Sequence, residues 1–344
     1  MQETMKALGQ KRFGGTEVLE EFNLPIPEPQ GTDLLIRVKA VGINPVDSLA
    51  RQNTNGFGQL QKQEISLTGW DGAGIVEAVG PLADGRFRVG DEVFFAGNLA
   101  RRGCQSEYTV VDSRIVGRKP VSLSFAEAAA IPLTALTVWE GMIEGCGIPL
   151  EPRPGKPKTA LVVGGAGGVG SIGIQILSRV CGLSVVATAS RQQSADHCRK
   201  MGASVVIDHY KDMKAQLAEN RIDAVDYVLN TTDPNTNFDA VVSLLAPLGR
   251  MCCILPVVRP VNLAALFDRR ISVSFELMFT RGLFNAQPEM QGSILDHLSA
   301  LLDAKTLRST LMTQTPWTLP GLVEAHRLSE SGKAIGKTVM SPVG

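Results

Sequence analysis

Residues 159–170 have the sequence TALVVGGAGGVG. An apolar run, Thr159–Val163, ends in glycines, and a segment with helical periodicity, Val169–Arg179, follows it. This order predicts a strand, a tight turn and a helix. The turn fits the pattern G-x-G-x-x-G, which is typical of a site that holds a pyrophosphate at a helix N-terminus. The residues of the pattern are Gly165, Ala166, Gly167, Gly168, Val169 and Gly170.

Each glycine of this pattern has a physical role. The first allows the tight turn, the second lets a pyrophosphate approach the backbone, and the third lets the helix pack closely on the strand. Glycine is common in this chain, with 35 residues, so a glycine-rich turn without a ligand is the alternative. The strand before the turn and the helix after it favour a dinucleotide site.

The sequence after residue 158 alternates between apolar strands and helices. Strands that are apolar on both faces and alternate with helices predict an α/β fold with a doubly wound parallel sheet, the Rossmann architecture. The predicted strands are Thr159–Val163, Val185–Ala189, Val205–Ile207, Val225–Leu229, Met251–Leu255 and Ile271–Phe279. The predicted helices are Val169–Arg179, Ser194–Met201, Lys214–Glu219 and Phe238–Leu245, with Gly202 as a helix cap.

The first 125 residues are rich in glycine, proline and β-branched residues. Short strands at close spacing, separated by turn residues, predict a folded-over β-domain. The predicted strands here are Leu34–Ala40, Gly74–Val79, Glu92–Phe95 and Glu107–Val111. Near the C-terminus we expect an amphipathic helix over Ile294–Leu302 and a closing strand over residues 336–340.

Length and charge narrow the possible functions. A chain of 344 residues favours two domains. Lysine plus arginine equals aspartate plus glutamate, at 34 each, so we expect no nucleic-acid and no membrane partner. The N-terminus lacks the apolar core of a signal peptide, and no apolar run is long enough to cross a bilayer. We therefore expect a cytoplasmic protein that acts on a small molecule.

The residues after the second predicted strand indicate which dinucleotide binds. A site for NAD usually has an acidic residue there, which holds the ribose 2′-hydroxyl. Here the strand is followed by Ser190 and Arg191, and no carboxylate occurs before Asp196. A serine hydroxyl and a guanidinium can both bind a 2′-phosphate. The sequence therefore predicts NADPH as the cofactor, with a solvated arginine at a strand end as the alternative.

Further segments resemble a known family. They are Val41–Asp47, Gly69–Gly74, Val89–Val93, Ile131–Thr137 and Phe279–Arg281. With the glycine turn, they make the chain similar to the medium-chain dehydrogenase/reductase superfamily, above all to the zinc-type alcohol dehydrogenase-like proteins of the quinone oxidoreductase group. The resemblance implies a GroES-like catalytic domain over residues 1–128 with 290–344. It also implies an NADP-binding Rossmann domain over residues 129–289.

The resemblance also implies site residues in both domains. The catalytic candidates are Asn44, Asp47, Trp70 and Thr134. Beside the glycine turn, the cofactor candidates are Asn44, Thr134, Thr137, Ser190, Arg191, Tyr210, Asn230, Thr231, Leu255, Pro256, Phe279, Thr280, Arg281, Lys333 and Lys337. Asn44 would bind the substrate carbonyl or a ribose hydroxyl, or cap a turn. Asp47 would relay a proton or cap a helix. Lys333 and Lys337 would reach the cofactor phosphates or be solvated.

The zinc ligands of the family are missing from this chain. The zinc-dependent branch has a cysteine in the stretch that matches Asn44–Asp47, a histidine at the position of Trp70, and a second cysteine near Thr134. This chain has none of them, and Asp47 and Asp71 alone do not make a catalytic zinc site. We therefore expect no bound metal.

A metal-free site suits a substrate that accepts hydride readily, such as a quinone or a carbon–carbon double bond conjugated to a carbonyl. The expected enzyme is an NADPH-dependent oxidoreductase of this type. The alternatives are a zinc-type alcohol or aldehyde dehydrogenase and a non-catalytic NADPH-binding protein. The apolar strand Ile271–Phe279 comes last in the predicted sheet, so we expect it to lie at an open edge. The resemblance implies that this edge pairs with its copy in a homodimer.

Overall fold

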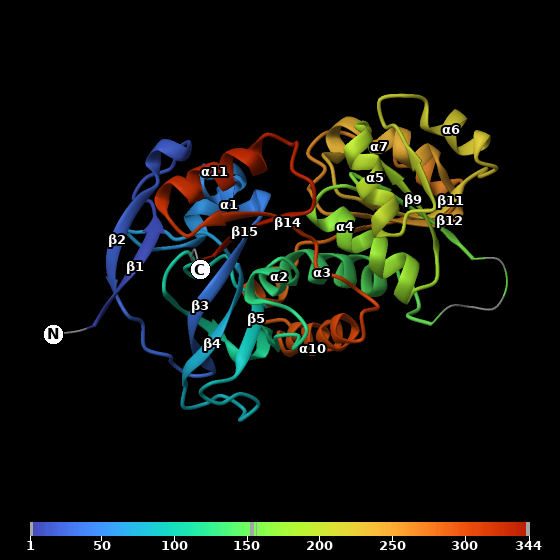
Figure 1. Ribbon diagram of the computed structural model, residues 1–344. Coiled ribbons are helices and arrows are strands. Elements are labelled where there is room, and N and C mark those ends of the chain that lie inside the picture. Colours follow the sequence, from blue (N-terminus) through green and yellow to red (C-terminus); the bar gives the residue numbers. More distant parts are fainter. Residues whose placement is uncertain (1–2, 152–154, 156, 342–344) are drawn as a thin grey trace. The chain divides into compact units, whose positions relative to one another are not determined.

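The computed structural model describes residues 3–151, 155 and 157–341. The chain forms two compact units, shown in Figure 1. Unit 1 comprises Met1–Leu133 with Phe279–Gly344, and unit 2 comprises Thr134–Met278. The sequence placed these boundaries at 128 and 290. Contacts within unit 1 explain the difference, because the Leu133 N–H donates to Asp71 and the Phe279 ring packs edge-on against Trp70 at 5.8 Å.

Unit 2 contains a six-stranded sheet with the order β10-β9-β8-β11-β12-β13. All neighbouring pairs are parallel. The strands are β8 (Thr159–Val163), β9 (Ser184–Thr188), β10 (Val205–Ile207), β11 (Val225–Asn230), β12 (Leu245–Cys253) and β13 (Ser272–Phe275). The predicted doubly wound parallel sheet is confirmed, and β8 and β10 have the predicted bounds.

Helices follow the strands of unit 2. They are α4 (Gly168–Gln175), α5 (Gln192–Met201), α6 (Met213–Glu219), α7 (Pro234–Ser243) and α8 (Ala264–Phe267). The helix α3 (Pro132–Val138) continues as a π-helical segment, η4 (Trp139–Gly145), and α4 continues as another, η5 (Ile176–Val180). Gly202 ends α5 with a φ of 123°, as predicted. The apolar strand residues and the inner faces of α6 and α7 form the core.

Three predicted segments of unit 2 were wrong in their bounds, and the strand predicted over Met251–Leu255 is β12, which runs over Leu245–Cys253. The strand predicted over Ile271–Phe279 is only β13, because the ladder ends where the Glu276 N–H donates to the Cys253 carbonyl. A short apolar run does not reveal where a strand stops. The helix α7 begins earlier than predicted, because Pro234 stands in its first turn and the Asp233 side chain caps it.

Unit 1 contains a seven-stranded sheet with the order β14-β15-β3-β4-β5-β7, in which β6 also pairs with β3. The strands are β3 (Asp33–Ile43), β4 (Asp71–Val79), β5 (Glu92–Ala96), β6 (Tyr108–Asp112), β7 (Val116–Arg118), β14 (Leu311–Pro316) and β15 (Lys337–Ser341). A separate antiparallel hairpin consists of β1 (Thr4–Gly9) and β2 (Glu20–Pro25). The closing strand of the chain therefore completes the β-rich unit.

The helices of unit 1 are short, apart from two near the C-terminus. They are α1 (Pro45–Arg51), α2 (Phe125–Ala129), α9 (Thr280–Phe284), α10 (Glu289–Asp303) and α11 (Leu319–Glu330). The 3-10 turns are η1 (Thr16–Val18), η2 (Thr54–Leu60) and η3 (Ser113–Ile115). In the described part of the chain, no helix has both the length and the apolar character needed to cross a membrane.

Three neighbouring strands of unit 1 bring polar residues to one end of the sheet. The strand β3 runs antiparallel to both β15 and β4. Thr338 of β15 pairs with Ile43, and Gly42 pairs with Asp71 of β4. The last residues of β3 therefore lie between the first residues of β15 and β4. This register places Asn44, Lys337 and Asp71 at the same sheet end.

Candidate functional site

The glycine turn after β8 is held against the end of β9. The Gly164 N–H donates to the Thr188 hydroxyl at 3.0 Å, and the Gly165 N–H donates to the Thr188 carbonyl at 3.1 Å. Gly164 has a φ of 79°, a conformation that L side chains rarely adopt. The turn is therefore held by two hydrogen bonds to Thr188.

The glycines of the turn differ in what surrounds them. A Cβ at Gly165 would lie 2.7 Å from the Ala187 Cβ. A Cβ at Gly170 would lie 2.7 Å from the Gly165 Cα and would also meet the Gly164 carbonyl. At Gly167 a Cβ would meet only the Gly164 carbonyl, at 3.6 Å, and the φ of −73° suits any residue. Packing inside the protein therefore explains Gly165 and Gly170 but not Gly167.

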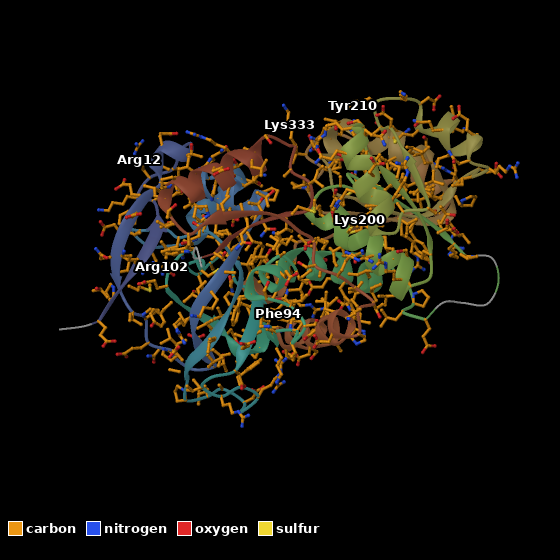
Figure 2. All side chains as sticks on the ribbon, in the orientation of Figure 1. Arg12, Phe94, Arg102, Lys200, Tyr210 and Lys333 are labelled. Atoms are coloured by element: carbon orange, nitrogen blue, oxygen red, sulfur yellow. The ribbon has the colours of Figure 1, made fainter. Side chains whose placement is uncertain are left out.

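The other cofactor candidates of unit 2 also follow the carboxyl ends of strands. Ser190 and Arg191 follow β9, and Arg191 is the N-cap of α5. Tyr210 follows β10 and is 82% exposed. Figure 2 shows its side chain at the surface. Further candidates in the same kind of position are Asn230, Thr231, Leu255 and Pro256. Because the strands are parallel, these positions all lie at the carboxyl end of the sheet, where open α/β sheets bind ligands.

The strand order of this sheet reverses between β8 and β11. Asn230 and Thr231 lie at this point. The Thr231 hydroxyl donates to the Val163 carbonyl at 2.7 Å, and the fully buried Asn230 donates to the Asn237 side chain at 2.8 Å. Thr231 therefore braces the end of β8, and Asn230 links the end of β11 to α7. Their expected contact with the adenine side of the cofactor stays a prediction.

A hydrogen bond that the sequence did not predict joins the first two helices of unit 2. The Ser171 Oγ of α4 and the His197 Nε2 of α5 lie 2.8 Å apart, and both residues are buried. Burial, together with the charge of Lys200, lowers the pKa of His197, so its ring is neutral near pH 7. This bond links the helix after the glycine turn to the helix that Arg191 caps.

In unit 1, buried polar side chains gather at the shared end of β3, β4 and β15. Asn44 is 2% exposed, Lys337 is 3% exposed, and Asp47 and Asp71 are fully buried. The Lys337 ammonium donates to the Ile43 carbonyl at 2.9 Å, to Asn44 Oδ1 at 2.5 Å and to Asp71 Oδ2 at 2.9 Å. These bonds use its three hydrogens, so the structure gives Lys337 partners other than the phosphates that were one expectation. The other expectation, a solvated lysine, is wrong, because the side chain is buried.

The second aspartate of this cluster caps a helix. Asp47 Oδ2 accepts the backbone N–H of Asn44 at 2.7 Å, and Asp47 Oδ1 accepts that of Gly69 at 3.0 Å. Of the two roles considered for Asp47, the structure shows capping of α1. Burial raises its pKa to about 7, against the opposing effect of these N–H groups and of Lys337.

Asp71 joins three parts of unit 1. Its Oδ1 accepts the Leu133 N–H at 2.6 Å, and its Oδ2 accepts the Asn44 side-chain N–H at 2.8 Å as well as the Lys337 ammonium. Thr134, which follows Leu133 in α3, is 2% exposed, and Thr137 is 5% exposed. The sequence alone did not identify these hydrogen-bond partners of Asp71.

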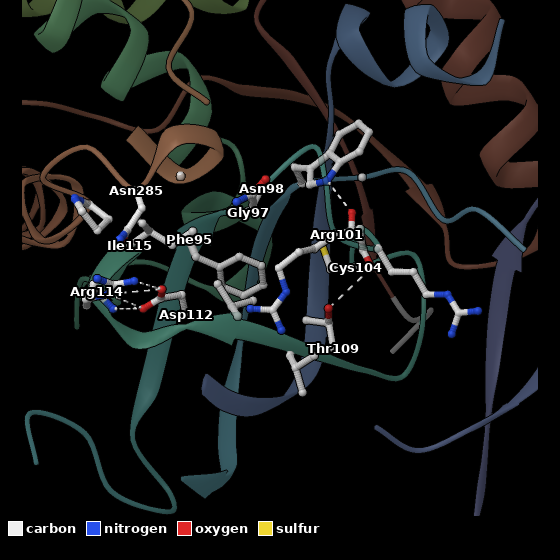
Figure 3. A pocket seen from close by; sticks show the side chains of 18 residues that line it. Phe95, Gly97, Asn98, Arg101, Cys104, Thr109, Asp112, Arg114, Ile115 and Asn285 are labelled. Carbon is white, nitrogen blue, oxygen red and sulfur yellow. Dashed lines mark hydrogen bonds and ion pairs between the residues drawn. The ribbon is translucent and has the colours of Figure 1, made fainter. Parts of the chain in front are cut away.

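Trp70 is 1% exposed and lines a small cavity of about 50 Å³ in unit 1. Its indole N–H donates to the Arg101 carbonyl at 3.3 Å. Figure 3 shows Arg114 paired with Asp112 in this cavity, and Arg101 pairs with Asp33 at 2.7 Å. The arginines Arg101 and Arg114 are therefore neutralised by carboxylates.

The remaining candidates of unit 1 lie near its C-terminal segments. Phe279 is 2% exposed because it packs on Trp70, and Thr280 begins α9. Arg281 donates to the Gln287 carbonyl at 3.3 Å. Lys333 lies exposed on the surface after α11 (Figure 2). The expected roles of these residues toward the cofactor stay predictions.

The cluster does not suit a zinc ion. Zinc sites use cysteine, histidine and carboxylate ligands. Both oxygens of Asp47 accept backbone N–H groups, both oxygens of Asp71 are bonded, and the Trp70 indole has no lone pair to offer. Across residues 3–151, 155 and 157–341, no three His, Cys, Asp or Glu side chains gather as a metal site. The cation that lies beside Asp71 is the Lys337 ammonium, 2.9 Å from Oδ2.

Known proteins are similar to both units. A sequence model of the alcohol dehydrogenase GroES-like domain matches residues 30–136, and one of zinc-binding dehydrogenases matches residues 201–340. A zinc-type alcohol dehydrogenase-like protein of Staphylococcus epidermidis is 33% identical over 98% of this chain and 99% of its own length. The chain belongs to the medium-chain dehydrogenase/reductase superfamily. The predicted family and fold class are thus confirmed.

Two further members of the superfamily have names that state a reaction. A chloroplastic NADPH-dependent alkenal/one oxidoreductase of Arabidopsis thaliana is 28% identical over 98% of this chain and 80% of its own length. A solved structure from Rhizobium etli CFN 42, named as a candidate zinc-dependent alcohol dehydrogenase, is 40% identical. It covers 100% of both chains with a TM-score of 0.92. The present chain, as a member of this superfamily, is therefore an oxidoreductase.

Proposed function

We propose that this protein is a metal-free NADPH-dependent reductase of quinones or of carbon–carbon double bonds conjugated to a carbonyl. The observation that carries the proposal is the open space at Gly167, where the protein's own packing does not require glycine. A glycine at that position of a G-x-G-x-x-G turn is what a close-lying pyrophosphate requires. The N–H groups at the start of α4 would then bind the phosphates.

Preference for NADPH is supported by the end of β9. Ser190 and Arg191 stand where an NAD site has a carboxylate, and both are exposed. Tyr210, after the neighbouring strand β10, is exposed as well. A guanidinium binds a phosphate through paired hydrogen bonds. The Arabidopsis relative, which reduces alkenals or alkenones according to its name, is NADPH-dependent.

The proposed substrate class follows from the side chains of unit 1 that could act as metal ligands. A zinc ion activates an alcohol by stabilising its alkoxide, and the buried cluster offers no free ligands for one. When bound, NADPH supplies a hydride. A quinone or a conjugated double bond accepts a hydride without a metal, because the charge that forms is delocalised onto a carbonyl oxygen. Alcohol oxidation is therefore the less suitable reaction.

The proton that completes the reduction has water as its source in this proposal. The chain has three tyrosines. Tyr108 packs against an apolar cluster of unit 1, while Tyr210 and Tyr227 belong to unit 2. Both oxygens of Asp47 are engaged, one in capping α1 and the other in accepting the Gly69 N–H. The residues of unit 1 would thus orient the substrate and exclude bulk water, and Trp70 would form an apolar wall.

The proposal includes a homodimer. β13 lies at the edge of the sheet, and its ladder is formed with β12. Phe275 on this strand is 59% exposed. An open strand with apolar side chains favours pairing with a second copy across a two-fold axis.

An assay of NADPH oxidation against quinones, alkenals, alkenones and saturated aldehydes tests this function. We expect turnover with the first three classes, faster with NADPH than with NADH, and little with saturated aldehydes. Turnover confined to alcohols and aldehydes would instead support the zinc-type alcohol dehydrogenase reaction. NADPH binding without turnover of any substrate would support a non-catalytic binding protein.

A further inference from the structure

The catalytic candidates of this protein lie on three segments that are distant in sequence. Asn44 and Asp47 begin α1, Trp70 precedes β4, and Thr134 lies in the first turn of α3. Each segment ends at the same buried cluster. Asp47 binds the N–H of Gly69, and Asp71 binds that of Leu133. The arrangement of the site therefore depends on what holds these two carboxylates together.

Lys337 supplies the positive charge of this cluster. Its side chain is 3% exposed and that of Asp71 is fully buried, with 2.9 Å between Nζ and Oδ2. A buried carboxylate needs a charged or strongly hydrogen-bonded partner, because water cannot solvate it. The charge of Lys337 also acts on Asp47. No local sequence pattern marks this lysine, since its partner is 266 residues away.

The same ammonium fixes the carboxamide of Asn44. Nζ lies 2.5 Å from Asn44 Oδ1, while Asn44 Nδ2 donates to Asp71 at 2.8 Å. The oxygen of the amide must therefore face Lys337, and its nitrogen must face Asp71. Without the ammonium, Oδ1 would lose its donor, and Asp71 would accept from Asn44 and Leu133 alone.

We propose that Lys337 is a positioning residue for the proposed reductase reaction, and that its ammonium, in place of a metal ion, draws the three site segments together. The inference rests on the proposed function for its effect on turnover. Lys337 would not bind the cofactor phosphates. Three donors on one compact cation match the three acceptors from Ile43, Asn44 and Asp71.

The test compares two variants with a matched control. Lys337→Met removes the ammonium, and the double variant Lys337→Met/Asp71→Asn removes both charges, so that no buried carboxylate at position 71 is left unpaired. The control is Lys119→Met. Lys119 is also buried in unit 1 and paired, with 3.1 Å to Glu92, but belongs to another cluster. Each protein is assayed for its melting temperature, its Kd for NADPH, and its kcat and KM for the best acceptor.

The positioning role predicts a loss of kcat that stability does not explain. The double variant should fold, bind NADPH within about twofold of the unchanged protein, and show kcat lowered roughly 100-fold, which is the cost of a misplaced site. Lys119→Met should melt at a lower temperature but keep its kcat. A kcat that is unchanged in the double variant would refute the proposal. NADPH affinity weakened about tenfold or more would show a phosphate contact instead.

A second readout does not depend on activity. With ¹⁵N-labelled asparagine, the side-chain N–H₂ of Asn44 should exchange slowly with solvent in the unchanged protein and rapidly in the double variant. This result would support the positioning role even if no acceptor were reduced, in which case only the proposed function would fail. Equal exchange in both proteins would contradict it.

Discussion

Asp47 accepts the backbone N–H of Asn44 at 2.7 Å inside a fully buried cluster, so the helix cap of the site is also a buried acid. Burial favours the protonated form of the carboxyl, whereas the two N–H groups and Lys337 favour the ionised form. Burial is the larger effect and raises the pKa to about 7. Protonation of Asp47 is therefore linked to the stability of unit 1.

Because of this proton binding by Asp47, we expect the free energy of unfolding to fall as the pH rises from about 4 to about 7. In that range the folded protein holds a proton on Asp47 that the unfolded chain releases, so the folded state binds more protons. The contribution is fully present below the unfolded pKa and is lost as the pH passes the folded pKa. Asp47→Asn should remove this part of the pH dependence.

The readout is the difference in urea midpoint between the two proteins at each pH. The comparison is needed because His326 acts in the opposite direction: burial lowers its pKa to about 3, which makes stability rise with pH. His326 is present in both proteins, so its contribution cancels. A difference that does not change between pH 4 and pH 7 would contradict the raised pKa of Asp47.

Gly167→Ala should separate ligand binding from folding. The Cβ would meet only the Gly164 carbonyl at 3.6 Å, so we expect stability within about 0.5 kcal/mol of the unchanged protein. The methyl would stand where the pyrophosphate approaches, and NADPH affinity should fall roughly 10- to 100-fold. Gly170→Ala is the packing control and should lower stability by about 1–3 kcal/mol. Full NADPH affinity in Gly167→Ala would place the dinucleotide elsewhere.

Arg191→Ala should change the choice of cofactor. Loss of a charge-assisted hydrogen bond to the 2′-phosphate costs about 1.5–3 kcal/mol, or roughly 10- to 100-fold in NADPH affinity. NADH lacks that phosphate, so its affinity should hardly change. Arg199, on the same helix α5 and 54% exposed, serves as the control, and Arg199→Ala should leave both affinities unchanged. Titrations of fluorescence with each cofactor measure this. Equal losses for NADPH and NADH would contradict the assignment.

The sequence predicts well those features that are set by residues close to one another in the chain. The strands β8 and β10 and the cap Gly202 match their predicted positions, because an apolar run and a glycine are local signals. The hairpin of β1 and β2 was not predicted, since β2 shows no regular alternation between buried and exposed residues. The pairing of Lys337 with Asp71 depends on the register of β15 and β4 against β3, which no local pattern contains.

Phe275→Lys should disrupt the proposed dimer. A lysine on the open edge of β13 would place two like charges across the two-fold axis, and charged edge residues oppose strand pairing. Light scattering at micromolar concentration should give the mass of two chains for the unchanged protein and of one chain for this variant. Val121, which is 89% exposed in unit 1, is the control, and Val121→Lys should stay dimeric. A monomeric unchanged protein would refute the proposal.

The central claim is that an NADPH-dependent reductase works here without a metal, while the family name carries zinc. The most direct test dialyses the purified protein against a chelator, measures zinc by elemental analysis, and then follows NADPH oxidation with the best quinone or enone. We predict well under one zinc per chain and an unchanged rate after dialysis, because every carboxylate oxygen of Asp47 and Asp71 already accepts a hydrogen bond within the protein. Stoichiometric zinc, with activity lost on chelation and restored by zinc alone, would contradict the account.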